Sequence, residues 1–249
     1  MLDLDHRLRQ AATQTPFQLA LADTHQQLTW QALDKKLNQV ADALLSAGLK
    51  PNERIAILGQ NTVDYALLFL GGLRAGICIT PLSTLASGTS LADMVNDSGA
   101  KLLFVSETYS ELITPQQNQL VNLLPGGLKN LAYEGEGRES FASFIAGGSI
   151  QSKDYPLSFA WGFNLIYSSG TTGLPKGILQ DRRYRAAECE MLAGLGLNNT
   201  SRGLFSTPLY SNTTLFLFLS ILGNGGTAFL MEKFTTQGFL KLSEKEAIT

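Results

Sequence analysis

The chain has 249 residues, of which 44% are hydrophobic and 16% charged, and its formal net charge is −2. That length fits one large domain or two small ones. The low charge gives no electrostatic reason to expect a nucleic acid or an anionic membrane as a partner. The two cysteines do not make a disulfide framework or a metal site.

Neither a signal peptide nor a membrane span is expected. The N-terminal segment carries both signs of charge and lacks the apolar core of a secretory signal. The longest apolar stretches, residues 66–73 and 215–222, are too short to cross a bilayer. The sequence therefore predicts a soluble, cytoplasmic protein.

Strand and helix patterns alternate through the first half of the chain. Apolar residues at helical spacing predict a helix over residues 31–47, with Gly48 as its C-cap, and a buried strand follows over 54–58. A helix that is apolar nearly all round is expected over 63–75, capped by Asn61 or Thr62. The elements expected next are a strand at 77–80, a helix at 91–97, a strand at 101–105, a helix from 107 and a strand at 128–131.

This alternation implies right-handed crossovers, and so an α/β fold with mainly parallel sheets and helices on both faces. Residues 133–158 are more polar and richer in glycine, and we interpret them as a connection between subregions of about 1–132 and 159–249. The elements expected after it are helices at 183–195, 214–222 and 236–246 and strands at 203–206 and 227–231.

The most distinctive segment, residues 167–178, reads Tyr-Ser-Ser-Gly-Thr-Thr-Gly-Leu-Pro-Lys-Gly-Ile. Its glycines let backbone N–H groups approach an anion, its hydroxyls add donors, and Lys176 adds a mobile positive charge. A predicted strand leads in and an apolar pair leads out, and neither the Walker nor the dinucleotide pattern is present. The composition favours binding of a polyphosphate; the alternative is a surface loop with a structural role.

The order of residues in this loop resembles, almost position for position, the phosphate-binding motif of the adenylate-forming (AMP-binding) superfamily. That superfamily includes acyl-CoA synthetases, aryl-CoA ligases, luciferases and the adenylation domains of peptide synthetases. The resemblance runs from roughly Pro16 to the end of the chain. It implies an incomplete N-terminal domain of the acyl-CoA synthetase-like fold.

The resemblance also implies a reaction in two steps. A carboxylate attacks the α-phosphate of ATP to give an acyl-adenylate and pyrophosphate, and a thiol, usually that of CoA, then displaces AMP. Such chemistry depends on positioning and charge neutralisation more than on side-chain bases. Lys176 would position the phosphates, Mg²⁺ would bridge their oxygens, and Thr172 is the candidate protein ligand of the metal. The residues expected to hold the β- and γ-phosphates are Ser168, Ser169, Gly170, Thr171, Thr172, Gly173 and Lys176.

A second polar segment, residues 206–214, follows a predicted strand and opens a predicted helix. Ligands of parallel α/β sheets bind beyond the carboxyl ends of strands. By the resemblance, Tyr210 takes the place of an aromatic residue that lines the acyl pocket, and Ser211 stands where many members carry histidine. The alternative interpretation is a helix N-cap formed by Asn212 or Thr213.

A basic cluster follows the loop, at Arg182, Arg183 and Arg185. It could contact polyphosphate or CoA, but a solvated helix start is the favoured interpretation. We found no metal-ligand spacing in the sequence.

The family's later motifs for adenine, ribose and magnesium, and its small C-terminal domain with a catalytic lysine, do not occur before Thr249. We therefore expect a truncated ligase that is weak or inactive alone; the alternatives are a non-catalytic nucleotide- or acyl-binding remnant and a plain α/β domain. An uncovered sheet edge and helix face would also favour self-association, for example as a homodimer.

Overall fold

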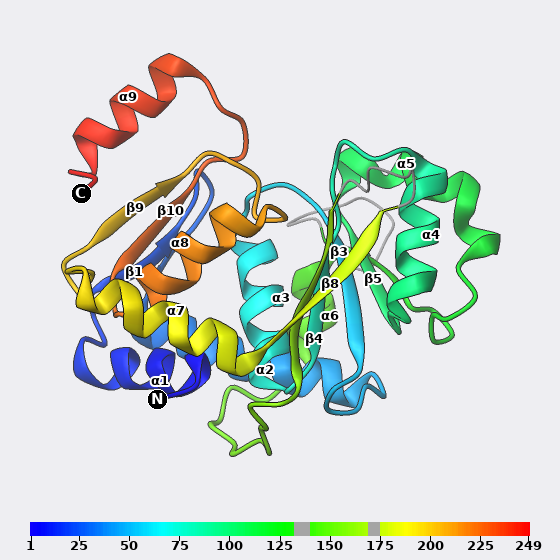
Figure 1. Ribbon diagram of the computed structural model, residues 1–249, viewed down its shortest axis with the longest axis horizontal. Coiled ribbons are helices and arrows are strands. Elements are labelled where there is room, and N and C mark those ends of the chain that lie inside the picture. Colours follow the sequence, from blue (N-terminus) through cyan, green and yellow to red (C-terminus); the bar gives the residue numbers. More distant parts are fainter. Residues whose placement is uncertain (132–139, 169–174) are drawn as a thin grey trace.

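Two β-sheets form the framework of the computed structural model, which describes residues 1–131, 140–168 and 175–249. A six-stranded sheet has the order β6-β5-β3-β4-β7-β8, and a four-stranded sheet has the order β2-β1-β10-β9. Figure 1 shows the two sheets side by side, with α2 and α3 between them. The predicted α/β fold with mainly parallel strands and helices is confirmed.

The six-stranded sheet is parallel except at its last strand, β8, which runs antiparallel to β7. In the four-stranded sheet β1, β10 and β9 are parallel, and β2 is antiparallel to β1. Because β1 pairs with β10, and β4 with β7, each sheet combines strands from before and after residues 133–158. The strands are β1 (Leu19–Ala22), β2 (Gln27–Thr29), β3 (Arg54–Leu58), β4 (Cys78–Pro81), β5 (Leu102–Val105), β6 (Leu128–Asn130), β7 (Gly162–Ser168), β8 (Lys176–Asp181), β9 (Arg202–Phe205) and β10 (Thr227–Leu230).

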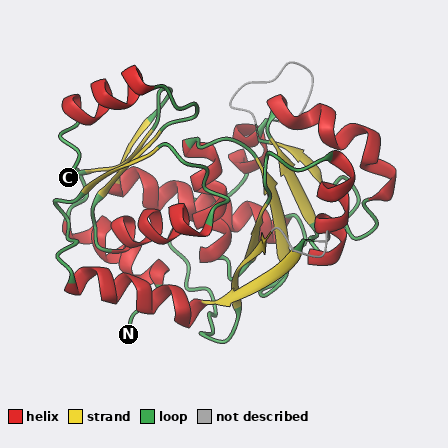
Figure 2. Cartoon of the chain, turned by 45° about the horizontal axis from the view of Figure 1, so that its top comes forward, coloured by secondary structure: helices red, strands yellow, loops and turns green. Residues whose placement is uncertain are grey.

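Helices cover both sheets and fill the space between them (Figure 2). Figure 1 shows α4 and α5 on the side of the six-stranded sheet that faces away from the four-stranded one. The helices are α1 (Leu4–Gln14), α2 (Trp30–Ser46), α3 (Val63–Arg74), α4 (Gly88–Ser98), α5 (Ser110–Ile113), α6 (Phe141–Ala146), α7 (Arg182–Gly194), α8 (Asn212–Gly223) and α9 (Thr236–Lys245), with 3₁₀ turns η1 (Glu107–Tyr109) and η2 (Thr114–Gln119).

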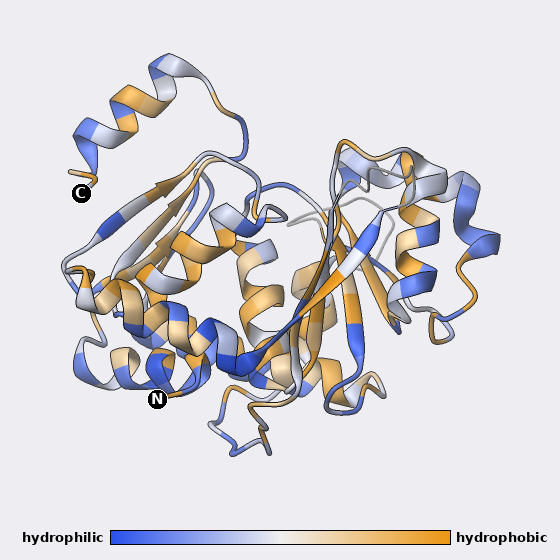
Figure 3. Ribbon diagram, viewed as in Figure 1, coloured by the Kyte–Doolittle hydropathy of each residue, from blue (hydrophilic) through white to orange (hydrophobic). Residues whose placement is uncertain are grey.

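The core has two parts, one on each face of the six-stranded sheet. Successive side chains of a strand point to opposite faces, and β3 follows this rule. Ile55 and Ile57 join the larger cluster with α2 and α3, whereas Ala56 and Leu58 join a smaller cluster with α4. Every residue of α3 is buried because the helix lies between the sheets, which explains its apolar sequence (Figure 3).

Local sequence sets the helix ends close to their predicted places. The Thr29 side chain accepts a hydrogen bond from the Ala32 N–H at the start of α2, and Gly48 adopts a φ of +96° just past its end, as a glycine in that position can without strain. Of the two candidate caps for α3, the structure selects Thr62, which accepts from the Tyr65 N–H. Within the described residues, no helix has the length and apolarity needed to span a bilayer.

Candidate functional site

The predicted phosphate loop connects the two strands of the β7–β8 hairpin. Ser168 ends β7 and Lys176 begins β8, and the two are paired across the hairpin with both side chains exposed. The structure thus brings these two predicted site residues together. The other predicted phosphate-binding residues lie outside the described residues, so their roles stay predictions; they are Ser169, Gly170, Thr171, Thr172 and Gly173.

The entrance to the loop is tied to α4. The Tyr167 hydroxyl donates a 2.5 Å hydrogen bond to Asp97 Oδ2. Partial burial of the phenol raises the pKa of Tyr167, and the Asp97 carboxylate raises that pKa further. Tyr167 therefore stays neutral at physiological pH, and its hydrogen bond to Asp97 fixes the loop end of β7 to α4.

The base of the same hairpin is held by a buried arginine on α7. Arg185 is 1% exposed, and its guanidinium donates to three amide oxygens and one carboxylate. The acceptors are Asn164 Oδ1 at 3.0 Å, Gln180 Oε1 at 2.6 Å, Asn212 Oδ1 at 2.8 Å and Glu188 Oε2 at 2.8 Å. We call these five side chains the Arg185 network. It joins β7, β8, α7 and the first residue of α8.

The basic cluster is therefore not a solvated helix start, and that interpretation was wrong for two of its arginines. Arg182 is 1% exposed and makes a bidentate pair with Asp3, with both distances 2.7 Å, while its Nη1 donates to the Leu73 carbonyl. A buried guanidinium is tolerated when its donors are satisfied in this way. Only Arg183 is exposed, as expected.

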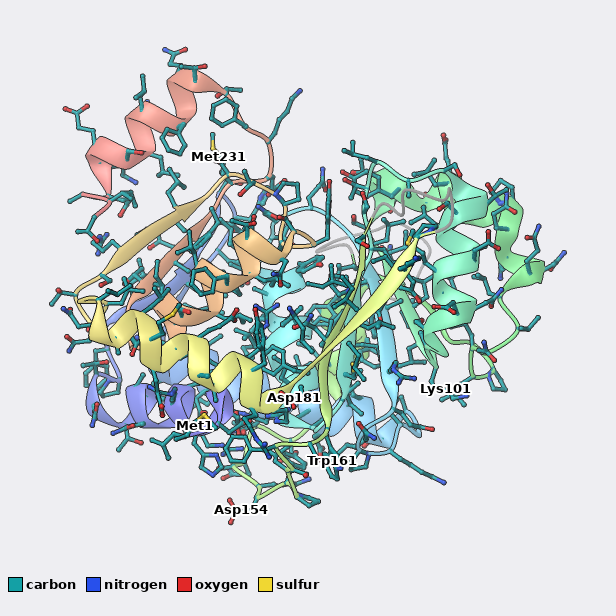
Figure 4. The ribbon with its side chains drawn as sticks, viewed as in Figure 1. Met1, Lys101, Asp154, Trp161, Asp181 and Met231 are labelled. Carbon is teal, nitrogen blue, oxygen red and sulfur yellow. The ribbon has the colours of Figure 1, made fainter. Side chains whose placement is uncertain are left out.

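Asp181, the last residue of β8, is the N-cap of α7. Figure 4 shows it where β8 meets α7, and its Oδ1 accepts from the Tyr184 N–H at 2.8 Å as an N-cap. The Arg182 N–H donates to the carbonyl of Trp161, the residue before β7. The cap and this bond fix the start of α7 under the hairpin, so Arg182 and Arg185 turn inward.

The second predicted segment lies between β9 and α8, at the carboxyl end of a parallel strand. Tyr210 and Ser211 are both half-buried there. Asn212 and Thr213, the caps named in the alternative interpretation, do not cap α8, since α8 begins at Asn212 and its boundary residue Ser211 makes no capping bond. The Asn212 side chain is occupied elsewhere, because its oxygen accepts from Arg185 and from Gln180 Nε2 at 3.2 Å.

The Arg185 network was missed by sequence reasoning. Asn164 was a usable signal, because it is a polar residue in an otherwise apolar strand and its side chain is fully buried. Buried amides need hydrogen-bond partners, and Asn164 Nδ2 finds Gln180 Oε1 at 2.8 Å on the neighbouring strand. The hydrogen bond that connects the network to Asn212 of α8 could not be inferred from local pattern, because Arg185 and Asn212 are 27 positions apart in sequence.

One cavity adjoins the Arg185 network, and another lies on a different part of the six-stranded sheet. A groove of about 580 Å³ between α7 and α8 is lined in part by Glu188 and Asn212 of the network. A cavity of about 530 Å³ lies elsewhere, between η2 and β6. Among the side chains that the structure describes, no group of three or more His, Cys, Asp or Glu residues could hold a metal ion.

The chain belongs to the AMP-binding enzyme family, whose model matches residues 8–249. Its sequence is 28% identical to the fatty acid–acyl-carrier-protein ligase ScoC of Streptomyces coeruleorubidus, over 69% of this chain and 31% of the relative. It is also 27% identical to feruloyl-CoA synthase of an Amycolatopsis species, over 96% of this chain and 46% of the relative.

The fold agrees with this assignment. The crystal structure of the anthranilate CoA ligase AuaEII in complex with anthranoyl-AMP superposes with a TM-score of 0.91 at 19% identity, covering 100% of this chain and 48% of that one. The chain thus spans less than half the length of each of these three proteins.

Proposed function

We propose that this chain supplies the phosphate-binding loop and part of the acyl pocket of a ligase that activates a carboxylic acid through an acyl-adenylate. The observation that carries the proposal is the loop itself, whose residue order matches the motif of the family to which the chain belongs. ATP and Mg²⁺ are the proposed cofactors, a small carboxylic acid is the substrate, and CoA is the proposed acceptor.

The described ends of the loop suit a polyphosphate. Lys176 places an ammonium group, and Ser168 a hydroxyl, on the exposed side of adjoining strands. Both groups can donate hydrogen bonds to phosphate oxygens, and the ammonium adds positive charge. Thr172 stays the proposed ligand for Mg²⁺. When bound, ATP would supply the electrophilic phosphorus and the pyrophosphate leaving group.

The residues of this chain would then act by position and charge. Lys176 and Ser168 would hold the terminal phosphates, so that the α-phosphate is presented to the acid. Tyr210 and Ser211 would form one wall of the acid's pocket, because they lie beyond the carboxyl end of β9. Such positioning, with neutralisation of charge, accounts for most of the catalysis in nucleotidyl transfer.

Calorimetric titration of the purified chain with MgATP and with inorganic pyrophosphate tests the phosphate site. Lys176→Ala should weaken both affinities about tenfold or more, since a charge-assisted bond contributes about 1.5–3 kcal/mol. Lys241→Ala, an exposed lysine on α9, is the matched control and should bind as the wild type does. Equal binding by Lys176→Ala, or no binding by the wild type, would contradict the proposal.

Acid-dependent exchange of pyrophosphate into ATP separates enzyme from remnant. Exchange that depends on a carboxylic acid and on Lys176 would support a catalytic role for this chain. Phosphate binding without exchange would support the alternative of a non-catalytic nucleotide- or acyl-binding module. A panel of aryl and medium-chain acids, with Tyr210→Ala as the variant, would report on the acyl pocket.

We further propose that the protein is cytoplasmic and self-associates. The observation behind self-association is α9, which has no buried residue and exposes Leu240, with Phe234 exposed just before it. Exposed apolar side chains grouped in this way favour association. Light scattering over a range of concentrations should show species larger than the monomer, and a constant monomer mass would count against it.

A further inference from the structure

A buried asparagine connects the two sheets at the ends of their strands. Asn61 lies in the loop between β3 and α3 and is 5% exposed. It follows β3 of the six-stranded sheet, yet its side chain bonds the last residue of β9 in the four-stranded sheet and the segment after it. Both strands present their carboxyl ends here, which is where ligands bind in parallel α/β sheets.

Asn61 makes three hydrogen bonds, all to backbone atoms of one short segment. Its Nδ2 donates to the carbonyls of Phe205 at 3.2 Å and Thr207 at 2.8 Å. Its Oδ1 accepts from the Leu209 N–H at 2.9 Å. An asparagine amide offers two N–H donors and one acceptor oxygen. Asn61 therefore holds the segment both by donating to its carbonyls and by accepting from one of its N–H groups.

The segment that Asn61 holds ends one residue before Tyr210. Leu209 is 2% exposed, so its side chain is anchored as well as its N–H. Further along, the Thr207 and Thr214 hydroxyls lie 2.7 Å apart, which closes the segment onto α8. The backbone on the N-terminal side of Tyr210 is thus held in place up to the residue before it.

The residues after Asn61 approach Tyr210 itself. Tyr65, in the first turn of α3, is 1% exposed, and its hydroxyl has no hydrogen-bond partner among the described residues. Burial first, and then the nearby Tyr210 phenol, raise the pKa of Tyr65. A buried hydroxyl without a partner is uncommon in native proteins.

We propose that Asn61 is a positioning residue that sets Tyr210 in the acyl pocket through the backbone of residues 205–209. The assignment of Tyr210 to the acyl pocket rests on the proposed function, whereas the connection from Asn61 to Tyr210 does not. Asn61 touches the segment and not the acid. Its contribution is to keep the wall of the pocket in one arrangement before the substrate arrives, which lowers the ordering cost of binding.

Asn61→Asp separates this role from simple packing, because the side chain keeps its size. As a carboxylate it still accepts from the Leu209 N–H, but its second oxygen faces the carbonyls of Phe205 and Thr207 and repels them. When protonated it donates to one of them again. The substitution should therefore disturb Tyr210 at neutral pH and restore its position as the pH falls, because burial among acceptors raises a carboxyl pKa.

The full chain, labelled with 3-fluorotyrosine, provides the measurement by fluorine NMR. Tyr210→Phe assigns the Tyr210 signal among those of the seven tyrosines. In Asn61→Asp that signal should shift or broaden at pH 7.5 more than any other and return towards the wild-type position at pH 5. In Asn61→Ala it should be displaced at both pH values. Asn199→Asp, on an exposed asparagine, is the matched control.

Titratable groups on or against the start of α3, next to Asn61, include Asp23, Asp64, Tyr65 and Tyr210. All four groups are present in the wild type and in both Asn61 variants. A pH response confined to Asn61→Asp therefore comes from the new carboxyl. A Tyr210 signal unchanged in both Asn61 variants would overturn the proposal, as would equal shifts of all tyrosines. If Asn61→Ala does not fold, Asn61→Ser takes its place. No ligand is needed, so failure here is distinct from failure of phosphate binding.

Discussion

The two strands that flank the predicted phosphate loop, β7 and β8, differ sharply in their surroundings. The first four residues of β7 are buried, and the strand is paired on both sides, with β4 and β8. The first four residues of β8 are exposed, and the strand is the last of its sheet. Ile178 and Leu179 on β8 are each 52% exposed.

The loop is therefore carried by one strand that is part of the core and one that is not. β7 is held in its buried first half, where Asn164 pairs with Ile79 of β4, and at its loop end by Asp97. β8 depends on its pairing with β7 and on Gln180, which the Arg185 network holds at the other end of the strand. The proposed role of the loop, to admit and release a polyphosphate, is suited by one fixed and one less supported side.

Arg185→Met should have the largest effect, because it removes the support of β8. It leaves Glu188, which is 9% exposed, without its cation, and it removes the Arg185 donor from the fully buried Asn164 Oδ1 and from the amide oxygens of Gln180 and Asn212. Removing one partner of a buried ion pair costs about 3–5 kcal/mol. Urea unfolding of the full chain, followed by tryptophan fluorescence, measures the change.

Arg183→Met is the control for this prediction. Arg183 lies on the same helix but is exposed, and a surface substitution changes the free energy of unfolding by about 0.5 kcal/mol or less. If the two variants lost similar stability, the Arg185 network would not be what holds β8 to the core.

The sequence predicts most strands and helices after residue 30 well, and the buried arginines poorly; α1, β1 and β2 were not predicted. Hydrophobic period reports which face of an element is buried, so the helix predicted at 63–75 is close to the observed α3. The same reasoning treats a charged residue as exposed. Arg182 is buried because Asp3, 179 positions earlier in the chain, reaches it. No local pattern contains a partner at that separation.

The predicted site follows the same division. Lys176, Ser168 and Tyr210 could be proposed as site residues because motif residues are consecutive in sequence, and their roles stay predictions. Asn61 was considered only as a helix cap, since its actual bonds go to residues 144 to 148 positions later. Residues that support a site through distant partners, as Asn61 does, can be identified only once the arrangement of the two sheets is known.

Tyr167→Phe should have an intermediate effect, because it releases the loop end of β7. The lost hydrogen bond goes to a carboxylate but is only half-buried, so about 1 kcal/mol of stability should be lost at pH 7. The pKa of Tyr167 is raised in the folded state by burial and by Asp97. Its contribution is therefore fully present below the ordinary tyrosine pKa of about 10 and is lost as the pH rises above it.

Urea midpoints between pH 8 and 11 check this second prediction. The wild type should lose more stability than Tyr167→Phe above pH 10, so the two curves should converge. Tyr109→Phe, another half-buried tyrosine, is the control and should not change the slope. Parallel curves for Tyr167→Phe and the wild type would show that the bond to Asp97 does not fix the loop.

Ile178→Thr should have the smallest effect and tests the comparison directly. Ile178 on β8 pairs with Ile166 on β7, so the two positions share one site of the hairpin. Ile178 is 52% exposed, whereas Ile166 is half-buried and packs against the larger core cluster.

Threonine keeps the β-branched shape that suits a strand. Ile178→Thr should thus change the free energy of unfolding by about 0.5 kcal/mol or less, and Ile166→Thr should cost about 1–2 kcal/mol through lost burial. Equal losses, measured by urea unfolding, would mean that β8 is as much a part of the core as β7, and the asymmetry of the loop's two supports would be lost with it.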